Sequence, residues 1–204
     1  MKLYDFELSG NCHKVRMMLS LLDLEYEKVG VDLRKKEQIR PEFAALNPLR
    51  KVPVLVDGDV VVRDSAAILV YLARRYGRDE WFPDDPTGMA EVQQWLSFSV
   101  HEVFNGLAMA RAIVIFKRDF DPKLAHALSA FALEQLEFRL RNHEWLALDR
   151  FTLADLVCYP YTGLIHEANL TLDDYPTTRA WCMRMEAMPG YVAMPGLPYP
   201  HKDL

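Results

Sequence analysis

The sequence predicts an α/β part in residues 1–78 and an all-α part in residues 88–204, joined by a linker at 79–87. Strand and helix patterns alternate in the first part, whereas long helical patterns dominate after the polar, proline-bearing stretch RDEWFPDDP. The chain has 204 residues, of which 50% are hydrophobic and 26% charged. This length and composition are typical of a globular protein that buries its own core.

The first part begins with a strand, a helix and a second strand. Residues 2–6 and 26–33 have the short runs typical of strands, and residues 12–23 between them repeat apolar side chains at helical spacing. Strands of one sheet that are joined by a crossover helix run parallel. We therefore expect a parallel pair at the start of the chain.

A β-hairpin and a helix complete the first part. The runs VPVLV at 52–56 and VVVR at 60–63 flank the turn DGD, which indicates antiparallel strands. Apolar side chains then recur at helical spacing over 65–76, and Gly77 is a typical end for that helix. The expected order is strand, helix, strand, short helix, hairpin and helix, with the hairpin adding antiparallel edges to the sheet.

Helical patterns make up the second part. One helix has a clear start, where Thr152 can cap the helix, Asp155 can reach back to the Thr152 N–H, and Phe151 and Leu156 flank the cap. We assign this capping box a structural role only. The expected helices cover about 88–117, 123–144, 153–168 and 176–187.

Charge and cysteine usage argue against several classes of protein. The formal net charge of −5 argues against nucleic-acid binding, although residues 1–78 hold 14 basic and 11 acidic residues and could receive a small anion. Cys12, Cys158 and Cys182 lack zinc-ligand spacing and suit a reducing compartment. The sequence shows no signal-peptide pattern and no apolar run long enough for a bilayer. We expect a cytoplasmic protein with no metal, nucleic-acid or membrane partner.

The first candidate site is the segment SGNCHKVR, where the first strand ends and a helix begins. A helix N-terminus offers free N–H groups and a partial positive charge, and Ser9 and Asn11 add a hydroxyl and an amide donor. Together these donors can stabilise an anion or a thiolate. Two alternatives stay open: Ser9 or Asn11 merely caps the helix, and Cys12 is either a thiol of low pKa or a buried side chain.

Two further candidate sites flank the hairpin. In KVPVL, a cis peptide bond before Pro53 would leave the Val52 backbone free to pair with a peptide ligand, and an ordinary trans edge proline is the alternative. At Asp64-Ser65, the serine hydroxyl and the helix N–H groups can hold a carboxylate while Asp64 faces an ammonium group. Helix capping alone is again the alternative.

The order of these segments resembles that of the cytosolic glutathione S-transferases. A strand is followed by SGNCHKVR, by NPLRKVPVLVDGDVVVRDSAAILVYL, by a linker, and by an all-α part with FTLADLVCYP and YPTTRAWCMRMEAMPGY. The resemblance covers nearly the whole chain and points to a bacterial member of the theta-like serine type or of a related beta-like or nu-like class. It implies a thioredoxin-like N-terminal domain, an all-helical C-terminal domain with an electrophile pocket, and a homodimer.

The resemblance also implies roles for residues around the hairpin. Pro53 matches the cis-proline of the family, so the Val52 backbone would pair with the cysteinyl unit of glutathione. Asp64 and Ser65 match the acid–serine pair that holds the γ-glutamyl amine and carboxylate.

Other positions match family residues that lie near the glycyl end or the sulfur of glutathione. Lys51 and Gln38 match positions that often approach the glycyl end of glutathione. Ser9 matches the activating serine of the theta-like classes, and Asn11 could share or replace that role, as an amide does in some bacterial members. Cys12 lies near the position at which cysteine-type members keep their thiol.

We therefore expect an enzyme that uses glutathione as co-substrate, needs no other cofactor, and activates the glutathione thiolate for attack on a hydrophobic electrophile. One alternative is glutathione-dependent reduction of disulfides or peroxides, which would favour Asn11 or Cys12 over Ser9. Another is a non-catalytic glutathione-binding module. The electrophile pocket is expected between the Ser9 loop and the helix at about 95–117, with contributions from Phe98, His101, Phe104, Asn105 and Met109.

Overall fold

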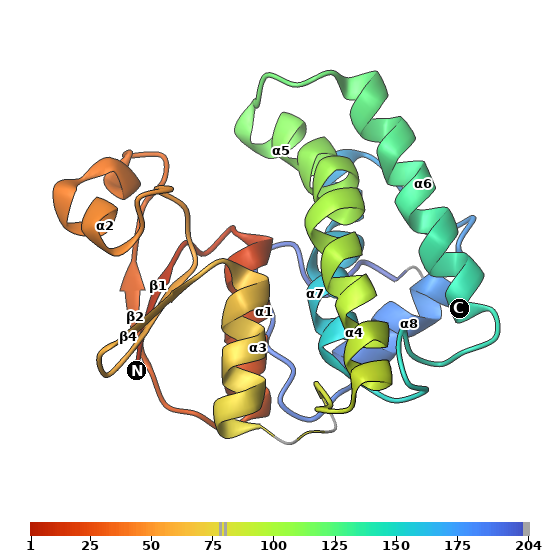
Figure 1. The fold of residues 1–204 in the computed structure, drawn as a ribbon. Helices are drawn as coiled ribbons and strands as arrows, with labels where there is room; N and C mark the ends of the chain where they lie inside the picture. The colour runs from red at the N-terminus through yellow and green to blue at the C-terminus, as the bar shows by residue number, and fades with distance from the viewer. Residues whose placement is uncertain (78, 80, 202–204) are drawn as a thin grey trace.

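The computed structural model describes residues 1–77, 79 and 81–201. A four-stranded sheet with helices is followed by a group of helices (Figure 1), which confirms the predicted fold class. The first part contains β1 (Lys2–Asp5), α1 (Gly10–Leu21), β2 (Glu27–Gly30), η1 (Glu37–Ile39), α2 (Pro41–Leu46), β3 (Val54–Asp57), β4 (Val60–Arg63) and α3 (Ser65–Tyr76). The second contains α4 (Pro86–Phe98), η2 (Ser99–Ala108), α5 (Met109–Phe116), α6 (Pro122–Leu140), α7 (Leu153–Gly163), η3 (Ile165–Ala168) and α8 (Pro176–Glu186).

The segment between α3 and α4 corresponds to the predicted linker at 79–87. The helix before it ends at Tyr76 and the helix after it begins at Pro86. Arg78 and Glu80, at the predicted boundary, lie outside the described residues, as do residues 202–204 at the end of the predicted helical domain. The domain bounds of 1–78 and 88–204 therefore stay a prediction.

The sheet joins a parallel pair to an antiparallel hairpin, as the sequence predicts. The strand order is β2-β1-β3-β4, in which β1 runs parallel to β2 and β3 runs antiparallel to β1 and β4. The register pairs Val54 with Tyr4 on one side and with Arg63 on the other. The end of β1, the start of β3 and the end of β4 therefore meet at one edge of the sheet.

The long helix expected over 88–117 is continuous but not uniform. The α-helical turns of α4 give way to the π-helical η2, and α5 completes the helix. Apolar spacing predicts a helix but does not separate α from π turns, because both keep an apolar stripe on one side. Gly106 in η2 lets this helix approach α6 closely, since a Cβ there would lie 2.7 Å from the Leu128 backbone.

This combined helix, Pro86–Phe116, has the length and composition of a membrane span. It has 31 residues, and a window within it reaches a mean hydropathy of 1.2. In the fold, however, 44% of that window is buried inside the protein, against α6 and α7 among other elements. Core helices of globular proteins pass the same test, so this stretch is only weak support for a membrane span.

The start of α7 forms the predicted capping box. Thr152 Oγ1 accepts the Ala154 N–H at 3.2 Å, and Asp155 Oδ2 accepts the Thr152 N–H at 3.0 Å. Asp155 Oδ1 also accepts the Leu146 N–H and the indole N–H of Trp181, at 3.0 and 2.9 Å. The Asp155 carboxylate is fully buried, so these donors replace the water that it loses.

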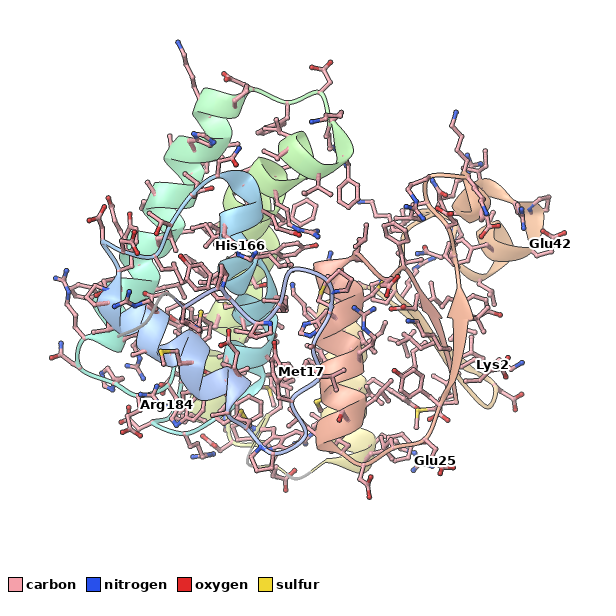
Figure 2. The ribbon with its side chains drawn as sticks, turned by 180° about the vertical axis from the view of Figure 1, so that it is seen from behind. Lys2, Met17, Glu25, Glu42, His166 and Arg184 are labelled. Atoms are coloured by element: carbon pink, nitrogen blue, oxygen red, sulfur yellow. The ribbon has the colours of Figure 1, made fainter. Side chains whose placement is uncertain are left out.

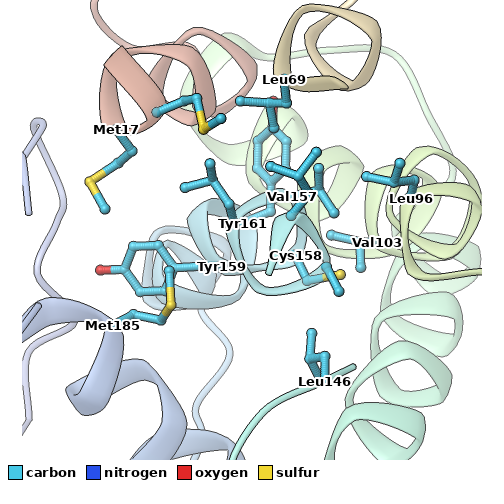
Figure 3. Close-up of a cluster of buried hydrophobic side chains, with 14 of the residues drawn as sticks. Met17, Leu69, Leu96, Val103, Leu146, Val157, Cys158, Tyr159, Tyr161 and Met185 are labelled. Atoms are coloured by element: carbon cyan, nitrogen blue, oxygen red, sulfur yellow. The ribbon is translucent and has the colours of Figure 1, made fainter. Parts of the chain in front are cut away.

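One hydrophobic core joins the two parts of the chain. Met17 of α1 and Leu69 of α3 are buried in the same cluster as Val157 of α7 (Figure 3). Seen from behind, the segment after α8 returns beside α1 (Figure 2), where His13 Nε2 donates to the Val192 carbonyl at 2.6 Å. This shared core fixes α1, and with it the loop before α1, relative to the helical part.

Candidate active site

Loops at one edge of the sheet bring the predicted site residues together. The turn that carries Ser9 follows β1, Val52 and Pro53 precede β3, and Asp64 follows β4. Because the register places these strand ends side by side, the loops meet near the start of α1. The loop that carries Gln38 follows β2 and leaves the sheet at the same edge, since β2 is parallel to β1.

The Ser9 side chain caps α1 and still keeps a hydrogen to donate. Its Oγ accepts the Cys12 N–H at 3.2 Å, and its own N–H donates to the Phe6 carbonyl at 2.9 Å. A hydroxyl oxygen that accepts a hydrogen bond can donate its own hydrogen to a second partner. Capping and ligand activation are therefore compatible at this position.

Two buried arginines hold the turn before Ser9. Arg16 Nη2 donates to the Glu7 carbonyl at 3.1 Å, and Arg111 Nη1 donates to the Leu8 carbonyl at 2.8 Å. Each guanidinium is also paired with a carboxylate. The turn is thus held from α1 on one side and from α5 on the other. Sequence reasoning misses both residues, because an arginine within a helical pattern carries no local sign of burial.

The Cys12 thiol lies in the core rather than at the surface of the site. It is fully buried in an apolar cluster with Phe6 and Val52, and its Sγ accepts the Phe6 N–H at 3.4 Å. Burial, reinforced by the negative charge of Asp5, raises the pKa of the thiol to about 12. Cys12 is protonated near neutral pH, so this geometry does not favour a mixed disulfide with glutathione.

Tyr161 packs directly against the start of α1. A Cβ on Gly10 would lie 2.7 Å from the Tyr161 ring, so only glycine admits the ring here. The Asn11 backbone N–H faces the Tyr161 hydroxyl, and burial raises the pKa of that hydroxyl to about 12. Tyr161 is therefore a protonated group at neutral pH and not a base. The Asn11 side chain is half-buried and makes no hydrogen bond to another described residue.

The loop before β3 presents free backbone groups. The Val52–Pro53 peptide bond is cis. Neither the N–H nor the carbonyl of Val52 is hydrogen-bonded within the described part of the chain. The buried Asn47 braces this loop, because its Nδ2 donates to the Lys51 carbonyl at 2.7 Å and its Oδ1 accepts the Leu49 N–H at 3.0 Å. Backbone groups held in this way are available to an extended ligand.

The acid–serine pair sits at the start of α3. Asp64 Oδ1 accepts the N–H groups of Ala66 and Ala67 at 2.9 and 3.2 Å, whereas its Oδ2 makes no bond to any described residue. The Asp64 backbone has φ 76° and ψ 129°, a strained conformation for a non-glycine residue. Ser65 follows at the first helical position and is 5% exposed. Strain together with a spare acceptor is typical of a binding position.

The comparisons with known proteins agree with this geometry. Family models of the glutathione S-transferase N-terminal and C-terminal domains match residues 3–80 and 116–189. The theta-1 glutathione S-transferase of Bos taurus is 32% identical over 94% of this chain and 85% of its own length. The disulfide-bond oxidoreductase YfcG of Escherichia coli is 27% identical over 90% and 89%.

Solved structures of glutathione transferases have the same fold as this chain. A glutathione S-transferase from Pseudomonas fluorescens superposes with a TM-score of 0.88 at 32% identity, covering 95% of this chain and 98% of that one. A glutathione transferase homologue from Drosophila mojavensis with bound glutathione has a TM-score of 0.84 at 30% identity, over 92% and 88%.

The chain belongs to the glutathione S-transferase family. The predicted family and the thioredoxin-like plus all-helical fold are thereby confirmed. Membership supports the predicted function of a glutathione transferase that uses glutathione as co-substrate without a further cofactor. Among the described residues, no group of three His, Cys, Asp or Glu side chains could hold a metal ion.

In this glutathione S-transferase, a hollow of about 530 Å³ lies between the Ser9 turn and the helix formed by η2 and α5. Phe104 and Met109 line it, as the sequence analysis expects. Phe98 and His101 line a different hollow between α4 and α6, and Asn105 is not among the lining residues of the first hollow. These three residues lie outside the hollow beside Ser9 because side chains along a helix point in several directions, whereas the prediction treats the whole of 95–117 as one face.

The two residues predicted for the glycyl end lie on separate loops at the same edge. Lys51 is exposed and forms no ion pair within the described residues. The Gln38 side chain lies in η1, and its Oε1 is buried without a partner among the described residues. Both positions suit a ligand that brings hydrogen-bonding groups, and their roles stay predictions.

Proposed function

We propose that Ser9 activates glutathione by donating its hydroxyl hydrogen to the glutathione sulfur. The O–H of Ser9 carries this proposal, because its oxygen is already engaged by the Cys12 N–H and its hydrogen can turn from the neighbouring Cys12 thiol to a ligand. The turn is held by Arg16 and Arg111, so the donor is oriented before the ligand arrives. The Asn11 amide next to it is a second donor that makes no hydrogen bond to another described residue.

The donors at this turn can supply the necessary energy. A thiol has a pKa of about 8.5, and lowering it by about two units requires roughly 2.7 kcal/mol of differential stabilisation. A hydroxyl donor to a charged sulfur contributes about 1.5–3 kcal/mol. The N-terminus of α1 adds about 0.3–1 kcal/mol. Ser9 and the helix together contribute about 1.8–4 kcal/mol, a range that includes the required stabilisation, with Ser9 as a donor and not a base.

The reaction that follows is a displacement or addition at carbon. The thiol proton passes to water when glutathione binds, and the thiolate lone pair then forms a C–S bond with the electrophile. In a displacement, the bond to the leaving group breaks and the leaving group takes the electron pair. In an addition, the π bond of the electrophile breaks, and its electron pair on the neighbouring atom takes a proton from water. The hollow beside Ser9 places the apolar electrophile next to the sulfur.

Glutathione itself would be held by the loops at the sheet edge. The unpaired backbone of Val52 would pair with the cysteinyl unit, and Asp64 Oδ2 would accept the γ-glutamyl ammonium. Ser65 and the first N–H groups of α3 would hold the γ-glutamyl carboxylate. Lys51 and Gln38 would approach the glycyl end.

The test is titration of the bound thiol. Ultraviolet absorbance of the thiolate in the binary complex should give a pKa for the wild type about two units below that of free glutathione. Ser9→Ala should raise this pKa and lower kcat by about 10- to 100-fold, while glutathione affinity at about pH 6, where the bound thiol is mostly protonated in both proteins, stays within about twofold. Asn11→Ala and Cys12→Ala are the matched controls. An unchanged thiol pKa in Ser9→Ala would overturn the proposal, and loss of the thiolate in Asn11→Ala alone would transfer the role to Asn11.

Assembly and location are proposed from the family resemblance. We infer a homodimer, and the hollow between α4 and α6 supports it because exposed apolar side chains such as Phe138 line it. Light scattering on the purified protein should give twice the mass of the chain, and a monomer would contradict this. A cytoplasmic location and the theta-like, beta-like or nu-like class are likewise inferred from the resemblance.

A further inference from the structure

We propose that this transferase selects electrophiles that carry a negative charge on an apolar body, and that Arg111 and the cations at the end of α5 recognise the charge. The inference rests on the proposed function, because it places the electrophile in the hollow beside Ser9. It concerns the class of electrophile and not the activation of the thiol.

The hollow is cationic although the protein is acidic overall. The chain has a formal net charge of −5, yet no aspartate or glutamate among the described residues lines the hollow. A cleft lined by one sign of charge concentrates ligands of the opposite sign. The cationic side chains that line it are Arg34, Arg111, Lys117 and Arg118.

Arg111 lines this hollow and carries a buried donor. Its side chain is 2% exposed, its Nε donates to Glu167, and its Nη1 donates to the Leu8 carbonyl. Its Nη2 is buried and has no hydrogen-bond partner among the described residues. An unpaired buried donor is costly, and an anionic group that enters the hollow would supply the missing acceptor.

Lys117 and Arg118 add exposed positive charge at the end of α5. Both side chains are exposed, and neither forms an ion pair within the described part of the chain. Arg34, across the hollow, is paired with Asp32 and lies over the Phe6 ring at 5.9 Å. Lys117 and Arg118 therefore carry positive charge that no ion pair within the described residues neutralises.

The remaining lining sets the shape of the ligand. Phe6, Phe104, Met109 and Phe116 give the hollow an apolar wall, which suits an aromatic or aliphatic body. Lys51 and Gln38, the residues predicted for the glycyl end of glutathione, do not line the hollow. The charge of the hollow therefore lies apart from the residues predicted for the glycyl end of glutathione.

The experiment compares two electrophiles of matched size. 4-(Chloromethyl)benzoate and 4-(chloromethyl)benzamide both react at the benzylic carbon, where a C–S bond forms and chloride leaves with the electron pair. We expect the ratio of kcat/KM for benzoate over benzamide, corrected for the uncatalysed rates, to exceed about threefold at low salt. Arg118→Glu should lower this ratio by about threefold or more, and Arg141→Glu, the same substitution at the far end of α6, should leave it unchanged.

A binding measurement decides the inference independently of turnover. The conjugates S-(4-carboxybenzyl)glutathione and S-(4-carbamoylbenzyl)glutathione should differ in Kd in the same direction, and Arg118→Glu should reduce the difference. Equal affinities, or a ratio that Arg118→Glu leaves unchanged, would overturn the inference. Absence of a bound thiolate in the wild type would instead overturn the proposed role of Ser9, and the conjugate affinities would still decide the charge preference.

Discussion

Asp155 at the start of α7 and Asp64 at the start of α3 show how an aspartate at a helix start serves folding in one place and binding in another. At α7, Asp155 is fully buried and both of its oxygens accept hydrogen bonds from the protein. At α3, Asp64 is exposed, only Oδ1 is engaged, and the backbone is strained. A saturated buried carboxylate has nothing left for a ligand, whereas an exposed carboxylate with a spare oxygen does.

The largest expected effect is the loss of stability when the Asp155 carboxylate at the start of α7 is removed. Asp155→Ala leaves the buried N–H groups of Leu146, Thr152 and Trp181 without an acceptor, so it should lower the free energy of unfolding by about 3–5 kcal/mol. Urea denaturation measures this loss. The folded fraction should bind glutathione with wild-type affinity, and a variant that loses glutathione binding without losing stability would reverse the assigned roles.

A smaller effect concerns how the buried cap depends on pH. Burial raises the pKa of Asp155 from 3.8 to about 6, against the opposing effect of its hydrogen bonds. The folded protein therefore takes up a proton before the unfolded chain does, and this contribution to stability is present at low pH and lost as pH rises through about 6. Relative to Asp155→Asn, the wild type should gain about 2 kcal/mol between pH 7 and pH 4.5.

The measurement is the free energy of unfolding of both proteins at the two pH values. Comparison with Asp155→Asn removes the contributions of other groups, such as His13, whose pKa burial lowers to about 4. A difference between the two proteins that does not change with pH would show that the three N–H donors keep Asp155 ionised.

The smallest effect on folding comes from the binding aspartate. Asp64→Asn keeps an acceptor for the N–H groups of Ala66 and Ala67 but removes the charge, so stability should change by less than about 0.5 kcal/mol. Glutathione affinity should nevertheless fall by about tenfold, because a charge-assisted bond to the ammonium is lost. Calorimetric titration checks the affinity. Thr152→Ala is the matched control, with about 1 kcal/mol of lost stability and unchanged affinity.

The same contrast explains what the sequence could predict. The Thr152–Asp155 box and the segments with Ser9 and Asp64 lie within a few consecutive residues, so local patterns identify them. The roles of Arg111 and Tyr161 depend on packing between parts of the chain about 100 residues or more from the Ser9 turn, as the separation of 103 residues from Leu8 to Arg111 illustrates. The burial of Cys12 likewise depends on the cluster around Phe6 and Val52 and has no local signature.

The turn before Ser9 is hydrogen-bonded to arginines from both parts of the molecule, so the position of the Ser9 hydroxyl depends on both parts. Arg16 reaches it from the sheet part and Arg111 from the helical part. Loss of the packing that fixes the two parts relative to each other would shift the Ser9 oxygen before the helices and strands unfold. On warming or in mild denaturant, kcat should therefore fall before circular dichroism or fluorescence changes. The reaction depends on the alignment of the two parts as well as on the side chains of the site.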